Sequence, residues 1–513
     1  IQMKYYFNYM IYGVDMELRE YQTLAIDEVR NLFKQGKKKI LLVSPTGSGK
    51  TIMACSMIQK ALDKNKSCLF VAHRRELVMQ CVQKLFDFGI TSGTLMSGKT
   101  ENKFENVQVA SIQTFTARKD NDDFNKPKAD LIILDEAHRS TSKSFKSLIE
   151  MYPESYVIGL TATPIRGDGK GLGNVYEELV ECGSIKGLQE QGFLVKTKYF
   201  APSIPDLKDI KVVRGDYDVR QLDKKMNTTK LVGDLVQHWI RHAENRPTVV
   251  FASSVAHSKY IAKIFNQNGI AAGHIDGTME ELERETVLNA MKNDEIKVIC
   301  NCMVLTEGWD LPKISACIIA RPTKSYGLYL QMVGRSLRIC PPEKHDTIVI
   351  DHSGCIYEHG FVEDAPEWEL TISKDKKDKK KKNVEPLNKQ PFTCVRCDTV
   401  YKITKENPEC PNCSFVPTKK EVQLLIKQGR LIELEKPKET PAHDKKKWYA
   451  QLLFIAKQKG YNVGWASHKF KDKFSHYPHS KQVIPMQPGK EVLGFIKHLQ
   501  IKQAKSKNFR RAS

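Results

Sequence analysis

The segment Ser44–Thr51 reads Ser-Pro-Thr-Gly-Ser-Gly-Lys-Thr, and it joins an apolar, strand-like run to a helix-like segment. A phosphate-binding loop requires that context, because its glycines let backbone N–H groups approach the phosphates and the helix N-terminus favours negative charge. Lys50 is expected to reach the β- and γ-phosphates of a nucleotide, and Thr51 to offer its hydroxyl to Mg²⁺. Ser44 stands where the common pattern has Gly, and a chance glycine-rich turn is the alternative. The remaining phosphate-binding residues are expected to be Thr46, Gly47, Ser48 and Gly49.

Apolar runs with the length of buried strands alternate with helix-like segments in two parts of the chain. Buried strands joined by helical crossovers are typical of a parallel sheet. We therefore predict an α/β fold with two parallel-sheet lobes. The expected strands are 40–44, 67–72, 107–110, 131–134 and 156–160 in the first lobe and 248–252, 296–300, 315–319 and 347–350 in the second, with helices at 50–62 and 75–87.

Two adjacent carboxylates, Asp135 and Glu136, follow the apolar run 131–134 in the sequence Asp-Glu-Ala-His. A carboxylate at a strand end beside a phosphate-binding loop is suited to holding Mg²⁺, which is the role expected of Asp135. Glu136 is then expected to polarise the water that attacks the nucleotide. An acidic helix cap is the alternative interpretation, and the phosphate-binding loop in the same lobe argues against it.

These two motifs and six further segments resemble the superfamily 2 helicases and translocases, whose motor consists of two RecA-like lobes. The resemblance covers about residues 16–355 and implies ATP as the nucleotide. By this resemblance, Arg19 and Gln22 read adenine, the segment 161–164 links hydrolysis to movement, and the segment that begins at residue 331 senses the γ-phosphate. The implied site residues are Arg74, Arg75, Gln113, Thr114 and Thr306 for nucleic acid, Gly308 and Asp310 for the nucleotide, and Gln331, Arg335 and Arg338 for catalysis.

Arg335 and Arg338 are spaced i and i+3, which places them on one helical face. Their guanidinium groups are suited to stabilising charge on a transferring phosphoryl group. We therefore predict that they are arginine fingers supplied by the second lobe. A pair of solvated helix arginines is the alternative.

The wording of the motifs indicates a branch of the superfamily. His138 and Gln331 stand where DEAD-box RNA helicases usually have Asp and His, and Met332 stands where DEAH-type RNA helicases usually have Arg. The segments His-Arg-Arg-Glu-Leu and Glu-Gly-Trp-Asp look more like the DNA-directed branch. A DEAH-box-type DNA enzyme is thereby implied, similar to RadD-type repair helicases and phage recombination helicases.

Four of the 13 cysteines form the pattern Cys-x2-Cys-x12-Cys-x2-Cys. Paired C-x-x-C knuckles bring together the four soft ligands that tetrahedral Zn²⁺ needs. We predict a zinc ribbon. Redox pairs and an iron–sulfur cluster are the alternatives. A structural role and a contact with DNA are equally open as the function of the ribbon. The other cysteines are scattered, which fits a reducing cytoplasm. The predicted zinc ligands are Cys394, Cys397, Cys410 and Cys413.

The formal charge of +21 points to a polyanionic partner. The region 444–513 holds 16 Lys or Arg and three Asp or Glu, and the run 374–382 holds seven Lys and two Asp. Basic and aromatic residues alternate in 444–513, as in surfaces that bind unpaired bases. A small helical domain with a solvated basic face is the alternative for this region, and a flexible linker is expected at the Lys-rich run.

The expected organisation begins with an extension at 1–15 that does not follow the alternation of strands and helices. Met16 is expected to be the natural first residue of the protein. No apolar run has the ~18 residues of a membrane span. The remaining expected parts are the first RecA-like lobe at 16–200, the second at 201–365, a Lys-rich linker at 366–390, the zinc ribbon at 391–417, a helical segment and linker at 418–443, and a basic nucleic-acid-binding region at 444–513.

The sequence therefore predicts an ATP-dependent DNA helicase or translocase that uses ATP, Mg²⁺ and Zn²⁺. Its expected partner is single-stranded, forked or branched DNA, and a role in recombination, repair or replication follows from the resemblance alone. The expected enzyme is a cytoplasmic monomer in a bacterial cell or a phage-infected host. The alternatives are a duplex DNA translocase that does not unwind, an RNA helicase, and a nucleic-acid-binding scaffold with an inactive ATPase.

Overall fold

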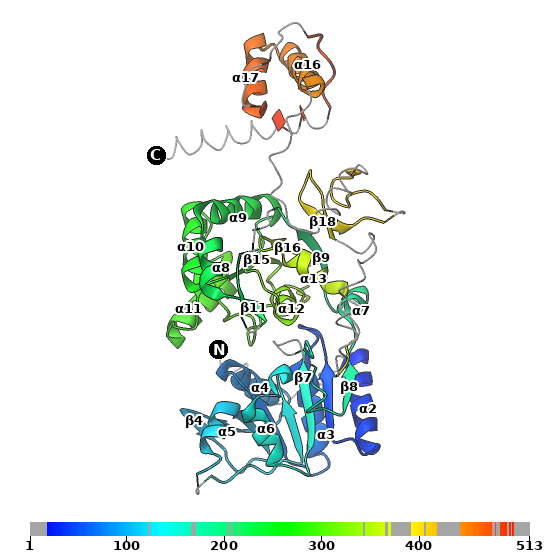
Figure 1. Ribbon diagram of the computed structural model, residues 1–513, viewed down its shortest axis with the longest axis vertical. Coiled ribbons are helices and arrows are strands. Elements are labelled where there is room, and N and C mark those ends of the chain that lie inside the picture. Colours follow the sequence, from blue (N-terminus) through cyan, green and yellow to red (C-terminus); the bar gives the residue numbers. More distant parts are fainter. Residues whose placement is uncertain are drawn as a thin grey trace, which may run out of the picture. The chain divides into compact units, whose positions relative to one another are not determined.

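A parallel sheet forms the first lobe of the computed structural model (Figure 1). Its strand order is β4-β3-β5-β2-β6-β7-β1-β8, and every neighbouring pair is parallel except β3–β4. The apolar runs predicted as strands are all strands, because they are buried on both faces between layers of helices. The strands are β1 Lys39–Val43, β2 Cys68–Ala72, β3 Gly93–Met96, β4 Lys99–Glu101, β5 Val107–Ser111, β6 Leu131–Leu134, β7 Tyr156–Thr161 and β8 Glu178–Glu181; the helices are α2 Glu20–Lys34, α3 Lys50–Leu62, α4 Arg75–Asp87, α5 Ile112–Arg118, η1 Ala137–Arg139 and α6 Lys143–Glu150.

A second eight-stranded sheet forms the second lobe, in the order β13-β14-β12-β15-β16-β9-β18-β17. Its first six strands are parallel, and its β9, Lys196–Phe200, pairs with β16. The other strands are β12 Thr248–Ala252, β13 Ala272–Ile275, β14 Val298–Asn301, β15 Ala316–Ala320 and β16 Asp346–Asp351; the helices are α8 Val219–Met226, α9 Thr229–His242, α10 Val255–Gln267, α11 Glu281–Lys292, α12 Tyr326–Gly334, α13 Cys355–His359 and η2 Val362–Asp364, and a hairpin joins β10 Val212–Val213 to β11 Asp216–Tyr217.

The predicted boundary between the lobes, after residue 200, is wrong. The strand β9 lies inside the second sheet, and α7, Ile185–Glu190, packs Ile185 and Leu188 into the second lobe's core. The first sheet ends with β8 at Glu181, so the second lobe begins between β8 and α7.

The predicted zinc ribbon is not a separate domain. Its hairpin consists of β17, Pro391–Thr393, and β18, Thr399–Lys402, and β18 pairs antiparallel with β9. The ribbon therefore extends the second sheet at its edge. Asp398 ties it further, since its carboxylate lies 3.1 Å from Arg241 and 3.3 Å from His242 on α9.

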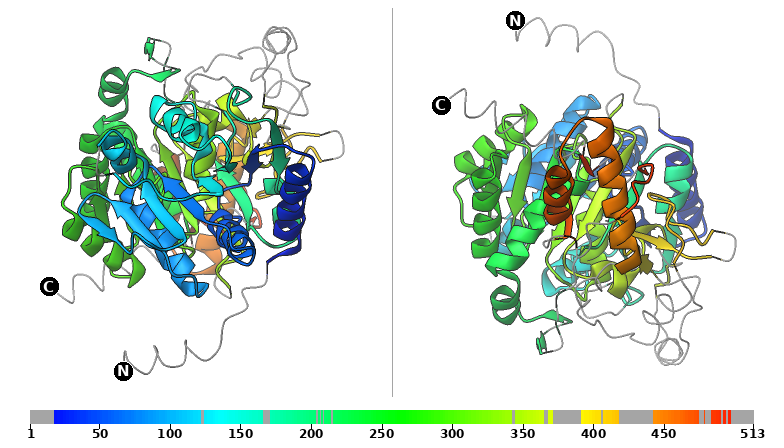
Figure 2. Two further views of the ribbon diagram at one scale, coloured as in Figure 1. Left: turned by 90° about the horizontal axis from the view of Figure 1, so that it is seen from below. Right: turned by 90° about the horizontal axis from the view of Figure 1, so that it is seen from above.

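The chain divides into two compact units, Ile1–Leu431 and Ile432–Ser513. In the second unit, α16, Ala442–Gln458, packs on α17, Val463–Phe474 (Figure 2, right, orange). Their contact buries Tyr449, Leu452 and Phe470, so the aromatic residues at 449 and 470 belong to a core rather than to a stacking surface. None of the helices in the described part of the chain has the length and apolar character that crossing a bilayer requires.

The structure describes residues 18–121, 124–165, 171–202, 205, 207, 209–213, 215–341, 344–364, 368–370, 391–404, 407–417, 442–474, 478, 483–489, 492–493 and 495–496. The predicted extension at 1–15, the Lys-rich run and, within the part expected at 418–443, the helical segment predicted at 420–434 lie outside the described residues.

Candidate functional site

The predicted phosphate-binding loop connects β1 to α3, as the sequence indicated. Gly47 and Gly49 have φ angles of 88° and 87°, a left-handed conformation that glycine adopts without strain. Lys50 is the first residue of α3, and its Nζ lies 3.2 Å from the carbonyl oxygen of Ser44. The Ser44 side chain is fully buried and shares a hydrogen bond with the Ser48 hydroxyl, so serine at the first position of the pattern fits inside the loop.

Asp135 and Glu136 lie directly after β6 and are 8% and 7% exposed. Burial, followed by the charge of Glu136, raises the pKa of Asp135 to about 7. No hydrogen bond from a described residue reaches Glu136 Oε2, although His138 Nδ1 lies 3.3 Å away. Two adjacent buried carboxylates with an unsatisfied oxygen fit a divalent cation, which opposes both causes of the raised pKa. Asp135 and Thr51 would hold Mg²⁺, which would supply charge neutralisation at the phosphates.

The predicted adenine-reading residues lie against the same loop. The side-chain amide of Gln22 donates to the Ser48 carbonyl oxygen at 2.7 Å, and the Tyr21 hydroxyl donates to the same oxygen at 2.8 Å. The Arg19 guanidinium lies 4.8 Å from the centre of the Phe193 ring. Tyr21 and Phe193 were not singled out from the sequence, because an aromatic residue in isolation carries no signal of its neighbours.

The predicted helical face carrying Arg335 and Arg338 does not exist. The helix α12 ends at Gly334; Arg335 caps it, and Arg338 lies in a β-bridge with Leu194. The Arg338 side chain still lies against the phosphate-binding loop, since a Cβ placed on Gly47 would lie 3.0 Å from Arg338 Cγ. Gln331, also predicted as catalytic, is 6% exposed on α12.

The predicted nucleotide and nucleic-acid residues around Thr306 instead position the two arginines. Arg335 donates to the carbonyl oxygens of Thr306 and Trp309, both at 2.6 Å, and Arg338 pairs with Asp310. Thr306 is 2% exposed, and its hydroxyl donates to the Met303 carbonyl oxygen, so its side chain is not available to a nucleic acid here. Gly308 has a φ of 72°, which lets the segment turn against α4.

The other predicted nucleic-acid residues belong to the first lobe, and two of them, Arg74 and Arg75, face the second lobe. The Arg74 and Arg75 guanidinium groups face the second-lobe carboxylates of Glu307 and Glu281, at 3.2 Å and 3.6 Å. The amide of Gln113 is exposed and donates to the His73 carbonyl oxygen at 2.6 Å. Thr114 is 8% exposed and accepts a hydrogen bond from the Ser97 N–H, so it supports the segment from within.

Two glycines that the sequence did not single out bring the lobes together. A Cβ on Gly334 would lie 2.5 Å from Thr46 Cβ, and a Cβ on Gly327 would lie 3.0 Å from Thr163 Oγ1. Both ends of α12 therefore touch the first lobe, one at the phosphate-binding loop and the other at the segment after β7. A pocket of about 120 Å³ between the lobes is lined by residues of both, including Thr46 and Gly334.

Replacing Gly334 by Ala is expected to slow ATP hydrolysis without loss of fold. The added methyl group would force Thr46 and the end of α12 apart, and a misplacement of about 1 Å at a reacting centre costs about 10²-fold in rate. Alanine is also a better helix former than glycine, so the melting temperature of the variant should not fall. Steady-state hydrolysis and a melting curve measure both effects.

Gly277→Ala is the control for this prediction, because a Cβ at Gly277 meets nothing within 4 Å. This variant should hydrolyse ATP at the parent rate. Parent-like hydrolysis by the Gly334 variant would show that the close contact at Thr46 is not part of the active arrangement.

The four predicted zinc ligands come together. Their sulfur atoms all lie within 4.8 Å of one another, with Cys394 and Cys413 at 3.5 Å and Cys397 and Cys410 at 3.6 Å. A tetrahedral zinc with Zn–S bonds of about 2.3 Å places its sulfurs about 3.8 Å apart. The cluster geometry therefore fits Zn²⁺ as a structural ion held by thiolates.

Two sequence families match the chain. The family described as the type III restriction enzyme, res subunit, matches residues 15–166, and the helicase conserved C-terminal domain matches residues 227–340. The two matches correspond to the two lobes. They span the phosphate-binding loop and the carboxylate pair in the first lobe and α12 in the second.

Relatives that align over most of this chain were also found. A 51.5 kDa protein of a Lactococcus phage (isolate 7-9) is 30% identical over 400 residues, covering 78% of this chain and 83% of that protein. The Saccharomyces cerevisiae protein IRC3, whose name describes an ATP-dependent helicase, is 32% identical over 65% of this chain, which spans 51% of IRC3. The solved ATP-dependent Type ISP restriction-modification enzyme LlaBIII aligns with a TM-score of 0.51 at 20% identity, over 66% of this chain and 28% of that one, which supports the fold.

Proposed function

The chain belongs to the superfamily 2 helicases and is an ATP-hydrolysing enzyme, and from that premise we propose that it is a DNA helicase that separates strands as it moves. One observation carries the proposal: Arg338 and Gly334 of the second lobe lie against Gly47 and Thr46 of the first-lobe loop. A change in the loop's occupancy must therefore alter the contact between the lobes. Such coupling is what converts hydrolysis into movement along a strand.

In the proposed reaction, Glu136 orients and deprotonates the attacking water, and Lys50 neutralises the phosphates. Arg335 and Arg338 stabilise the charge that develops on the transferred phosphoryl group. Their present partners are carbonyl oxygens and Asp310, so ATP must compete for them. After phosphate is released, the two arginines pair again with these carbonyl oxygens and with Asp310, and the lobes return to the arrangement described above.

We propose DNA rather than RNA as the track. The motif wording around residues 73–77 and 307–310 resembles the DNA-directed branch. LlaBIII, which shares the fold, is described as bound to DNA. Single-stranded or forked DNA, a role in repair, recombination or replication, a monomeric state, and a cytoplasmic location in a bacterial cell or phage-infected host complete the proposal.

ATP hydrolysis measured in parallel with single-stranded DNA, duplex DNA, forked DNA and RNA tests the choice of track. Single-stranded or forked DNA should stimulate most, and a labelled fork should be separated with ATP. Stimulation by duplex DNA without strand separation would instead indicate a translocase. Stimulation by RNA alone would refute the DNA assignment.

Removing residues 440–513 is expected to weaken DNA binding and to flatten its salt dependence. That segment contains the region with 16 basic and three acidic residues, and each lost phosphate contact reduces the log–log slope by about 0.7–0.9. A salt titration of forked-DNA binding by the full chain and by the chain ending at Glu439 measures the change. DNA-free ATP hydrolysis is the control, because the cleft residues all precede 340; equal slopes and affinities would contradict the role of this region.

A further inference from the structure

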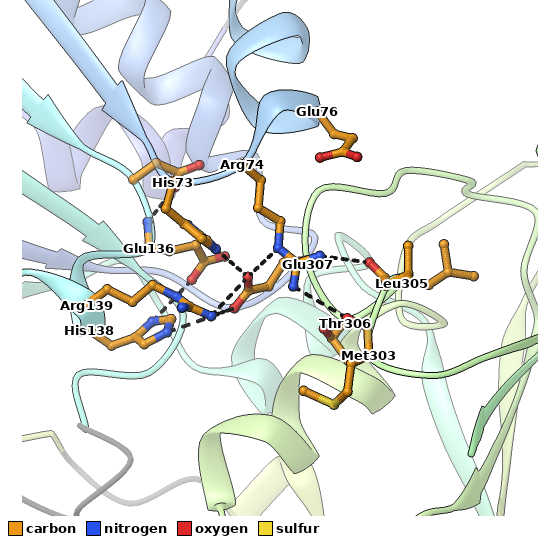
Figure 3. Close-up of polar contacts among 12 residues, drawn as sticks. His73, Arg74, Glu76, Glu136, His138, Arg139, Met303, Leu305, Thr306 and Glu307 are labelled. Carbon is orange, nitrogen blue, oxygen red and sulfur yellow. Dashed lines mark hydrogen bonds and ion pairs between the residues drawn. The ribbon is translucent and has the colours of Figure 1, made fainter. Parts of the chain in front are cut away.

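Glu307 is a buried second-lobe carboxylate surrounded by basic side chains of the first lobe (Figure 3). Its side chain is 4% exposed. Its oxygens lie 2.8 Å from His73 Nε2, 3.2 Å from Arg74 Nε and 3.2 Å from Arg139 Nη2. A buried carboxylate is stable only when it is paired in this way, so the contact between the lobes depends on these partners.

The whole Arg74 guanidinium is engaged by the loop that carries Glu307. Besides the carboxylate, it donates to the carbonyl oxygens of Val304 at 3.2 Å and Met303 at 3.4 Å. Arg74 is also the residue expected to grip a nucleic-acid phosphate. A phosphate and a carboxylate offer a guanidinium the same kind of charged oxygen pair, so they compete for one site.

Glu307 also reaches the hydrolytic residues. His138 lies between two carboxylates, with Nδ1 at 3.3 Å from Glu136 and Nε2 at 4.0 Å from Glu307. One ligand atom from each of the three residues lies within 4.8 Å of the others. Any displacement of Glu307 therefore changes the charge that Glu136 experiences across His138.

We propose that Glu307 is a positioning residue that pairs with Arg74 at the place of a nucleic-acid phosphate. When a phosphate displaces Glu307 from Arg74, the new position of the carboxylate changes the charge around Glu136 through His138. The inference rests on the proposed function, since it requires a strand that binds Arg74. Without a bound strand, Glu307 holds the lobes together and neutralises the positive charge of Arg74. A bound strand takes Arg74, and the freed carboxylate shifts toward its remaining partners beside the hydrolytic centre.

The test compares Glu307→Gln with the parent in two assays on the full chain. Nucleotide-free binding of oligo(dT) should become about fivefold or more tighter, because the strand no longer has to displace a carboxylate from Arg74. The ratio of oligo(dT)-stimulated to basal ATP hydrolysis should fall about fivefold or more toward one, because the variant no longer senses the strand. A purely structural role would move neither the affinity nor the ratio in these directions.

Glu281→Gln is the matched control. Glu281 also pairs across the lobes, with Arg75 at 3.6 Å, but the two side chains are 63% and 48% exposed, and such pairs contribute little. This variant should match the parent in affinity and in ratio. Arg74→Gln should cost more DNA affinity in the Glu307→Gln background than in the parent, because in the parent the displacement of Glu307 offsets part of what the contact between Arg74 and the phosphate contributes.

Weaker or unchanged DNA binding by Glu307→Gln, or an equal cost of Arg74→Gln in both backgrounds, would overturn the inference. If removal of the buried charge lowers the melting temperature too far, Glu307→Asp keeps the charge but shortens its reach. It should bind oligo(dT) more tightly than the parent, and parent-like or weaker binding counts against the inference. A parent that neither binds nor responds to DNA overturns the proposed function as well, whereas a responsive parent with a parent-like variant overturns only the role of Glu307.

Discussion

Replacing Glu136 by Gln is expected to slow ATP hydrolysis by about 10²–10⁴-fold while ATP binding persists, because loss of a general base has that cost. Glutamine keeps the shape of the side chain but neither removes a proton from water nor carries charge beside His138. The binding elements, Lys50 and the loop before it, are untouched. Single-turnover hydrolysis and binding of a fluorescent ATP analogue measure the two effects separately.

Lys50→Ala is the contrasting variant. Its loss removes the cation at the phosphates, so binding itself should weaken. Glu136 and Lys50 would thus be separated by their effects on turnover and on affinity. Hydrolysis at near the parent rate in the Glu136 variant would show that another group activates the water.

The parts of the site that local patterns encode were predictable. The turn from β1 to α3 and the carboxylates after β6 depend on residues adjacent in sequence, and the structure has them where the pattern indicates. The sheet membership of β9 was not predictable, because it depends on pairing with β16, where Lys196 lies opposite Asp346. An apolar pattern predicts a strand but not its neighbour.

The same limit applies to the second-lobe residues. Helical spacing suggested one face for Arg335 and Arg338, but α12 ends at Gly334, where its backbone must approach Thr46. Glu307 belongs to the Glu-Gly-Trp-Asp segment that the sequence singled out, yet nothing in the neighbouring sequence indicates that it is buried among four basic groups of the other lobe. Residues whose role depends on the contact between lobes are therefore those that the sequence indicated least well.

The purified protein is expected to hold about one Zn²⁺ per chain, and Cys410→Ser combined with Cys413→Ser should abolish it. Loss of two thiolates leaves half a coordination shell, and structural zinc in small peptides contributes about 10–16 kcal/mol of binding free energy that is available to folding. Because β18 pairs with β9, the variant should also unfold the edge of the second sheet. Elemental analysis and hydrogen exchange of 196–200 measure the two effects.

Cys302→Ser combined with Cys340→Ser is the matched control, since both cysteines are partly exposed and lie outside the cluster. That variant should keep its zinc and its exchange protection at β9. Zinc in the control but not in the ribbon variant would assign the metal to the four cysteines. Iron, or no metal, in protein made with zinc supplied would refute the zinc assignment, and unchanged protection at β9 after zinc loss would show that the sheet edge holds the hairpin without the ion.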